Sequence, residues 1–264
     1  MVINIFYVAS DLSVIRHTMW LINNGDKKGR KLAKDTINSI ILWVNRFINS
    51  ELDAKEFIYQ YNNSANTRNN IRKALKYLCR YKNIKEPEYL KIESIVIKEL
   101  IKAPSKDEVL EFLSKIKDRE VRCYLALCAT QGIRSRRLLQ LRWNELDLKN
   151  GWININENVR TKKYRPNPIH RDVINALDNL RDKQRVFTFS THKVRINIAD
   201  TKIDIAPSNL RDFFYNEARK QGVDRDILEW LMGHSLGIKA HYLADNIKEE
   251  YAKFEEAFRL KDII

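Results

Sequence analysis

Residues 207–242 read PSNLRDFFYNEARKQGVDRDILEWLMGHSLGIKAHY. Apolar residues at helical spacing predict one helix over residues 208–220 and a second over 225–232. Arg211 lies near the start of the first helix, and His234 and Tyr242 follow the second. A guanidinium, an imidazole and a phenol can bind an anion, move a proton and attack as a nucleophile. The stretch therefore predicts both a helical fold and a reactive site.

The rest of the second half mixes helix and strand. Ser105 and Glu108 have the spacing of a capping box and predict the start of a helix after Pro104. Asn150-Gly151 predicts the turn of a β-hairpin over residues 147–155. An edge strand is expected over 164–169 because prolines interrupt it. Further helices are predicted over 120–131, 134–142, 171–181 and 246–260, with a break at Gly132.

The first half has helical periodicity. Apolar residues recur at helical spacing over residues 36–50, 54–61 and 66–82. We place a domain boundary near residue 103, which divides the chain into a helical domain over 1–103 and a second domain over 104–264. The predicted fold class is mainly α with a small β-sheet, in two domains.

The charge of the chain indicates an anionic partner. The formal net charge is +14 and the isoelectric point is near 9.6. Nucleic acid is the leading candidate because each neutralised phosphate releases counterions, although an acidic membrane surface or a merely basic protein remains an alternative. One predicted helix, 66–82, carries an excess of basic residues, interpreted either as a solvated surface or as a phosphate-facing one: Arg68, Arg72, Lys73, Lys76 and Arg80.

The remaining composition argues for a cytoplasmic protein. The cysteines Cys79, Cys123 and Cys128 have neither an even count nor a C-x-x-C spacing. We therefore expect free buried thiols in a reducing compartment, and no zinc site. No apolar run approaches the roughly 20 residues of a membrane span, and the opening residues lack a basic segment typical of a secretory signal.

The scattered polar residues fit phosphoryl transfer without a metal. Arginines would clamp the phosphate oxygens, a nucleophile would attack, and a proton donor would protect the leaving oxygen. No acidic cluster with magnesium-ligand spacing accompanies them, so no metal and no other cofactor is expected. The second half offers this set in sequence order: Arg134, Lys162 or its neighbour Lys163, Arg211, His234 and Tyr242.

At these residues the chain resembles the tyrosine recombinase (phage integrase) family. The family pattern runs T-G-x-R, a hairpin lysine, H-x-L-R, L-G-H-S and a tyrosine about nine positions later. The matching segments run from Thr130-Gln131-Gly132-Ile133-Arg134 through Lys162, Ser208-Asn209-Leu210-Arg211 and Met232-Gly233-His234-Ser235 to Tyr242. The resemblance covers residues 104–264. Within it, the sequence is similar in detail to integrases of archaeal viruses and plasmids.

The resemblance implies a site-specific recombinase that clamps duplex DNA and assembles as a homotetramer on it. Tyr242 would attack the scissile phosphate, Arg134 and Arg211 would hold its oxygens, Lys162 would protonate the leaving oxygen, and His234 would assist. Two positions depart from the family. Ser208 replaces a histidine and could only hydrogen-bond the phosphate, and Arg137 stands where the family has an acidic residue.

Several alternatives stay open. The hairpin register decides whether Lys162 or Lys163 faces the site. Tyr215 and Tyr251 compete with Tyr242 as nucleophile, although their neighbours favour packing roles for both. A topoisomerase-like nicking and closing enzyme would use the same chemistry without a target sequence. A DNA-binding protein that kept the fold without catalysis is the third possibility, and the complete residue set argues against it.

The last predicted helix, 246–260, has an apolar stripe formed by Ile247, Tyr251, Phe254 and Phe258. A stripe of this kind must be buried. Its own domain could cover the stripe. The resemblance implies instead that an adjacent subunit covers it. The second interpretation predicts that loss of residues 246–264 weakens assembly on DNA.

Overall fold

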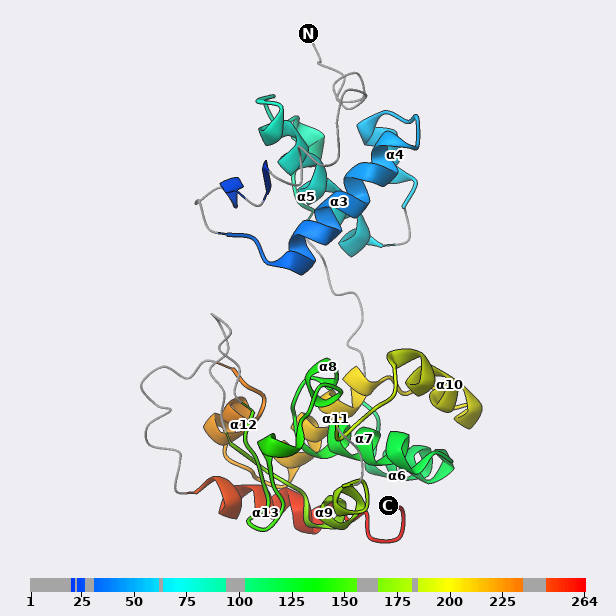
Figure 1. Ribbon diagram of the computed structural model, residues 1–264, viewed down its shortest axis with the longest axis vertical. Coiled ribbons are helices and arrows are strands. Elements are labelled where there is room, and N and C mark those ends of the chain that lie inside the picture. Colours follow the sequence, from blue (N-terminus) through cyan, green and yellow to red (C-terminus); the bar gives the residue numbers. More distant parts are fainter. Residues whose placement is uncertain are drawn as a thin grey trace. The chain divides into compact units, whose positions relative to one another are not determined.

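The computed structural model describes residues 20–21, 23–26, 31–61, 64–93, 103–155, 166–181, 185–234 and 246–264 (Figure 1). The chain divides into two compact units, Met1–Leu100 and Ile101–Ile264. Each unit has its own hydrophobic core. The boundary predicted near residue 103 stays a prediction, since residues 94–102 lie outside the described part.

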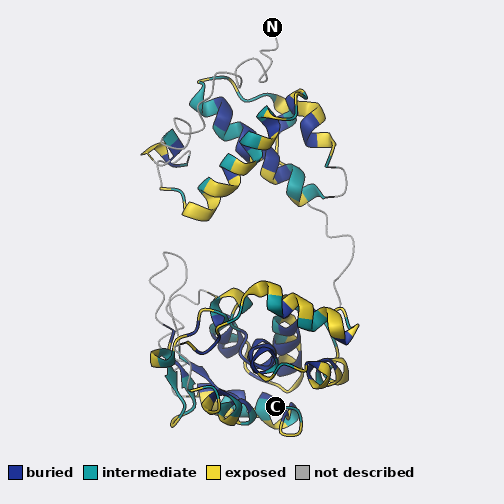
Figure 2. Cartoon of the chain, turned by 45° about the vertical axis from the view of Figure 1, so that its right-hand side comes forward, coloured by how far each residue is buried: buried dark blue, intermediate teal, exposed yellow. Residues whose placement is uncertain are grey.

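The first unit is built from helices that cross over a small core. It contains α3 (Lys34–Ile48), α4 (Ala54–Tyr59), α5 (Ala65–Tyr81) and the short 3₁₀ helix η1 (Glu88–Leu90). Side-chain caps start two of them: the Asp53 carboxylate accepts from the backbone of α4, and the Ser64 hydroxyl accepts from that of α5. The buried residues of α3 and α5 face each other, as Figure 2 shows.

The Arg72 side chain lies inside the first unit and not on its surface. It is 2% exposed. Its Nε donates to the Tyr89 carbonyl at 3.1 Å, and a terminal nitrogen donates to the Glu93 carboxylate at 2.6 Å. Arg68 donates to the other oxygen of that carboxylate at 3.0 Å. The expectation that Arg72 faces DNA is therefore wrong for this structure, because its hydrogen bonds hold the segment after η1 against α5.

The second unit surrounds a buried central helix. The elements α6 (Lys106–Lys115), α7 (Arg119–Thr130) and α11 (Pro207–Lys220) form its centre, with α9 (Arg171–Asp178) and α12 (Arg225–Leu231) around them. Every residue of α7 from Cys123 to Thr130 is buried. The predicted capping box of α6 is present, because Ser105 and Glu108 each accept from the other's backbone nitrogen.

A small antiparallel sheet lies beside these helices. The described strands are β1 (Leu146–Asp147), β2 (Trp152–Ile153) and β3 (Asn167–Pro168), in the order β1-β2-β3. The predicted turn is confirmed: Gly151 has φ +69°, and the Asp147 carboxylate accepts from the backbone and the amide of Asn150. Proline is tolerated in β3 because that strand is at an edge.

The structure differs from the prediction at two helices. The helix predicted over 134–142 is only α8 (Ser135–Leu138), followed by the 3₁₀ helix η2 (Trp143–Glu145). The chain folds back because the Glu145 carboxylate accepts from the Arg142 backbone and pairs with Arg137. The helix α10 (Thr191–Thr201) was not predicted, since only Val194 and Thr201 are buried along it and no apolar stripe marks it.

The apolar stripe of α13 (Ile247–Ala257) is buried in its own unit. Phe254 and Phe258 are fully buried in the core that includes Phe213 and Phe214 of α11. The imidazole of buried His170 lies 2.7 Å from the Phe258 carbonyl and fixes the end of this segment. The interpretation that the stripe docks on an adjacent subunit is therefore wrong for this structure.

Deletion of residues 246–264 is expected to unfold the second unit, and not merely to weaken assembly. The deletion removes five core side chains, Ile247, Tyr251, Phe254, Phe258 and Leu260. Each contributes roughly 1.5–3 kcal/mol by burial, and their sum reaches the whole stability of an ordinary domain. Circular dichroism melting would show this as loss of the cooperative transition of the second unit. A truncated chain that melts like the full one, but fails to assemble on DNA, would restore docking on a neighbour.

The three cysteine side chains are all thiols in the interior of the protein. Cys79, Cys123 and Cys128 are free and buried, as predicted. Burial raises the pKa of the Cys123 thiol to about 12, so this thiol is protonated and unreactive. Within the described ranges, no helix combines the length and the apolar character needed to cross a bilayer.

Candidate active site

Arg134 is placed by a tightly packed glycine turn after α7. Gly132 has φ +59°, and a Cβ atom there would lie 2.8 Å from the Phe214 ring and 3.0 Å from the Met232 sulfur. Both the backbone conformation and the packing therefore require glycine at this position. The turn leaves Arg134 exposed at the N-cap of α8, at the start of a helix as predicted.

Arg211 projects from α11 toward the end of α12. Pro207 is the first residue of α11, where its missing N–H costs nothing. A terminal nitrogen of Arg211 donates to the Met232 carbonyl at 2.8 Å. Burial, and then the charge of Arg134, lower the pKa of Arg211 from 12.5 to about 10, while Asp212 opposes the shift. Arg134 and Arg211 are thus near enough to repel each other.

His234 is held by the way α12 ends. Gly233 has φ +71°, and the His234 N–H donates to the Glu229 carbonyl at 2.9 Å, which is the hydrogen bond of a Schellman motif. The same turn brings the imidazole Nδ1 against the Glu229 carboxylate. The His234 side chain is 44% exposed, so its ring is both fixed and accessible.

One buried amide ties these segments together. Asn167 of β3 is 4% exposed, and its Nδ2 donates to the Gln131 carbonyl at 3.0 Å and to the Leu231 carbonyl at 3.1 Å. It therefore joins the turn before Arg134 to the helix end before His234. Sequence reasoning missed Asn167, and its only local signal was a polar residue between two prolines in an expected strand.

The helix α13 supports the same turn from the other side. The Tyr251 hydroxyl donates to the Thr130 carbonyl at 2.9 Å and lies 3.3 Å from the Gln131 amide nitrogen. Burial raises the pKa of Tyr251 well above its ordinary value of 10. Tyr251 thus has the packing role that its apolar neighbours predicted.

Of the other residues singled out in the sequence, the structure describes Ser208 and Arg137 but not Lys162, Lys163 or Tyr242. Ser208 is exposed in the first turn of α11, three residues before Arg211. Arg137, which stands where the family has an acidic residue, pairs with Glu145. Lys162, Lys163 and Tyr242 lie outside the described residues, so their assignments stay predictions.

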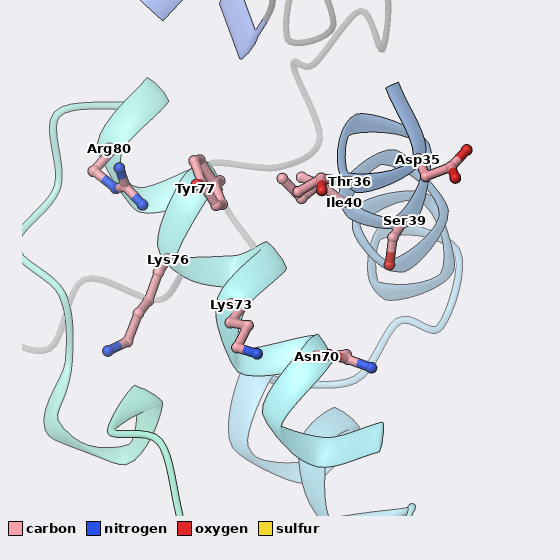
Figure 3. A pocket seen from close by; sticks show the side chains of 9 residues that line it. All are labelled: Asp35, Thr36, Ser39, Ile40, Asn70, Lys73, Lys76, Tyr77 and Arg80. Atoms are coloured by element: carbon pink, nitrogen blue, oxygen red, sulfur yellow. The ribbon is translucent and has the colours of Figure 1, made fainter. Parts of the chain in front are cut away.

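The remaining basic residues of α5 line a groove in the first unit. Lys73, Lys76 and Arg80 face a pocket of about 500 Å³ whose other wall is α3, with Thr36 and Ser39 (Figure 3). Glu86 lies 3.6 Å from the Lys76 ammonium and 3.8 Å from the Arg80 guanidinium. The groove thus combines basic side chains and hydroxyl groups with one acidic side chain, Asp35.

The second unit has the fold of the catalytic domain of tyrosine recombinases, with arginine and histidine side chains gathered from distant segments. The chain belongs to the phage integrase family, whose pattern matches residues 91–248. Comparison with curated protein sequences gives no significant match. The finer similarity to integrases of archaeal viruses and plasmids stays a prediction.

Solved structures of this class are similar to the chain in fold. Lambda integrase (residues 75–356) bound to DNA has a TM-score of 0.65 at 13% identity, with 95% of this chain and 99% of that chain covered. The XerH site-specific recombinase bound to its difH substrate has a TM-score of 0.57 at 20% identity, with 93% of this chain and 84% of that chain covered. The integrase from mycobacterium phage Brujita has a TM-score of 0.53 at 17% identity, with 93% of this chain and 92% of that chain covered.

Proposed function

We propose that the chain is a site-specific recombinase that cuts and rejoins duplex DNA through a 3′-phosphotyrosine, integrating or excising a mobile element or viral genome. The observation that carries the proposal is that the segments of Arg134, Arg211 and His234 meet. Asn167 joins the turn before Arg134 to the end of α12, and Arg211 binds the Met232 carbonyl at that same end. The charge of Arg134 also contributes to the lowered pKa of Arg211. Two neighbouring guanidinium groups repel each other unless an anion lies between them, and a phosphodiester fits that requirement.

The proposed reaction uses residues of this chain alone. The Tyr242 oxygen attacks phosphorus, the bond to the 5′ oxygen breaks, and Lys162 or Lys163 gives that oxygen a proton. Arg134 and Arg211 hold the non-bridging oxygens, and His234 assists either as the base that takes the Tyr242 proton or, if that proton passes to water, as a hydrogen-bond donor to the phosphate. The phosphotyrosine keeps the bond energy, so a 5′-hydroxyl of a second strand can reverse the step. No metal or cofactor takes part.

We further propose a homotetramer on DNA. Lambda integrase, which is similar in fold, is seen as a dimer on a COC′ core site and as a tetramer on a Holliday junction. The burial of α13 in its own unit leaves the contact between subunits to another segment. We place the reaction in the cytoplasm, or in the nucleoid of a host if the element is viral, where DNA and free thiols occur together.

The experiment that tests the function traps the covalent intermediate. The protein is incubated, with and without EDTA, with a pool of randomised duplexes that are nicked so that the cleaved end diffuses away. A covalent adduct that forms in EDTA, with enrichment of one sequence among the trapped DNA, is expected. Trapping that stops in EDTA while binding persists would overturn the metal-free reaction. Equal trapping of all sequences, with relaxation of any supercoiled plasmid, would instead identify a topoisomerase-like enzyme.

The groove of the first unit is proposed to bind DNA phosphates through Lys73, Lys76 and Arg80. Among the described residues, Lys73 is exposed and has no ion pair with a carboxylate. Arg68 and Arg72 are left out of this proposal because Glu93 already engages both guanidinium groups. The groove walls supply hydroxyl donors beside the charges.

Lys73→Ala is expected to reduce the slope of log K against log salt by about one, because one phosphate contact is lost. Its melting temperature should not change. Arg72→Met is expected to leave the slope unchanged and to lower the melting temperature by more than about 5 °C, because it leaves buried partners unpaired. Fluorescence anisotropy over a salt series measures the slope, with Lys55→Ala, an exposed lysine of α4, as the control. An equal loss of slope in Arg72→Met would show that Arg72 reaches a phosphate.

A further inference from the structure

The end of α12 brings a carboxylate to the histidine of the site. In a Schellman motif the residue after the glycine bonds back to a carbonyl five positions earlier. Here that pair is His234 and Glu229, so the backbone itself sets the two side chains next to each other. The imidazole Nδ1 contacts the Glu229 carboxylate, and no other side chain is required to form this contact.

The contact determines which nitrogen of the ring carries hydrogen. An ionised carboxylate only accepts hydrogen bonds, so Nδ1 must be the protonated nitrogen. The other nitrogen, Nε2, then remains available to accept the proton of the attacking hydroxyl or, in the imidazolium form, to donate to a phosphate oxygen. A histidine without such a partner samples both tautomers and several ring orientations.

Glu229 is itself held by the helix that carries Arg211. The Tyr215 hydroxyl lies 3.5 Å from the second oxygen of the Glu229 carboxylate. Tyr215 and Arg211 are one turn apart on α11, and Arg211 binds the Met232 carbonyl at the same end of α12. Two contacts thus join α11 to the α12 terminus. The side chain of Glu229 is 24% exposed, which limits competition by water.

We propose that Glu229 is a positioning residue for His234. It accepts the Nδ1 hydrogen, fixes the tautomer and directs Nε2 to the phosphate. This inference rests on the proposed function, in which His234 acts at the scissile phosphate. Partners that orient a functional histidine in this way are typically worth 10- to 100-fold in activity.

A double-mutant cycle tests the proposal on the DNA trapped by the wild-type protein. Glu229→Ala is expected to slow covalent trapping roughly 10- to 100-fold with unchanged DNA affinity. Glu229→Gln, whose amide oxygen still accepts the Nδ1 hydrogen, should stay within about threefold of the wild type. In a His234→Ala background the Glu229→Ala change should have no further effect, because its partner is gone. Equal losses in both backgrounds would overturn the proposal, as would full activity of Glu229→Ala.

A second measurement does not depend on the reaction. Long-range ¹H–¹⁵N spectra of the free protein report the tautomer of His234. The Nδ1-protonated form is expected in the wild type and in Glu229→Gln, and a mixture is expected in Glu229→Ala. The same mixture in all three proteins would refute the positioning role even if trapping works. If the wild type traps no DNA while the spectra follow this pattern, the proposed function fails and the Glu229–His234 pairing stands. Glu249→Ala, which removes an exposed carboxylate of α13, is the control.

Discussion

Tyr242→Phe is expected to bind DNA with the affinity of the wild type and to form no covalent adduct. Phenylalanine keeps the ring but lacks the oxygen that attacks phosphorus. Denaturing gels of trapped suicide duplexes measure the adduct, and gel shifts measure binding. The expected loss is complete, down to the background of the assay. An adduct that persists in Tyr242→Phe would show that another tyrosine is the nucleophile.

The structure strengthens this prediction by locating the two competing tyrosines. The Tyr251 hydroxyl is buried and donates to the Thr130 carbonyl, so it cannot reach a phosphate on the surface. The Tyr215 hydroxyl lies against Glu229. Tyr215→Phe is expected to keep forming the adduct, although more slowly, because its hydroxyl helps to hold Glu229. Peptide mapping of the trapped protein identifies the modified tyrosine directly.

Arg211→Met is expected to reduce covalent trapping by at least about 10³-fold and, at the same time, to raise the melting temperature. The first effect follows because removal of one preorganised donor to a reacting oxyanion already costs 10²- to 10³-fold, and a guanidinium supplies two donors and a charge. The second follows because burial and Arg134 disfavour the charge of Arg211 in the folded state. Functional sites commonly carry such a cost in stability.

The size of the stability effect depends on pH. Burial lowers the pKa of Arg211 to about 10 in the folded chain, from its ordinary value of 12.5. The unfolded chain therefore holds this proton more tightly, and stability rises with pH between those values. Below about pH 10 both states are charged and the full penalty is present. Arg211→Met should consequently melt higher than the wild type at pH 7.

Inorganic phosphate separates anion binding from catalysis. A bound anion stabilises the folded state in proportion to its occupancy. Rising phosphate concentration should therefore raise the melting temperature of the wild type more than that of Arg211→Met. Arg211→Lys keeps the charge without the planar fork and should show an intermediate response. Identical shifts in all three proteins would contradict a phosphate site at Arg211.

Local signals in the sequence predicted most of the elements and all of the candidate site residues except Asn167. The capping box at Ser105 and Glu108, the turn at Asn150-Gly151 and the apolar stripe of the last helix all act over a few residues. Such features are visible in sequence because their partners are close along the chain. The order of Arg134, Arg211 and His234, with Gly132 before the first and Gly233 before the last, was sufficient to indicate the family for the same reason.

Only the tertiary structure decided which side chains meet. Arg72 looked like its neighbours on a basic helix face, yet a carboxylate 21 residues away draws it into the interior. The stripe of α13 could have been covered by another subunit, and the core around Phe213 and Phe214 covers it instead. Asn167, which joins the turn before Arg134 to the end of α12, had no pattern to mark it. In each case the deciding contact spans many residues, and its energy depends on burial that no local stretch of sequence contains.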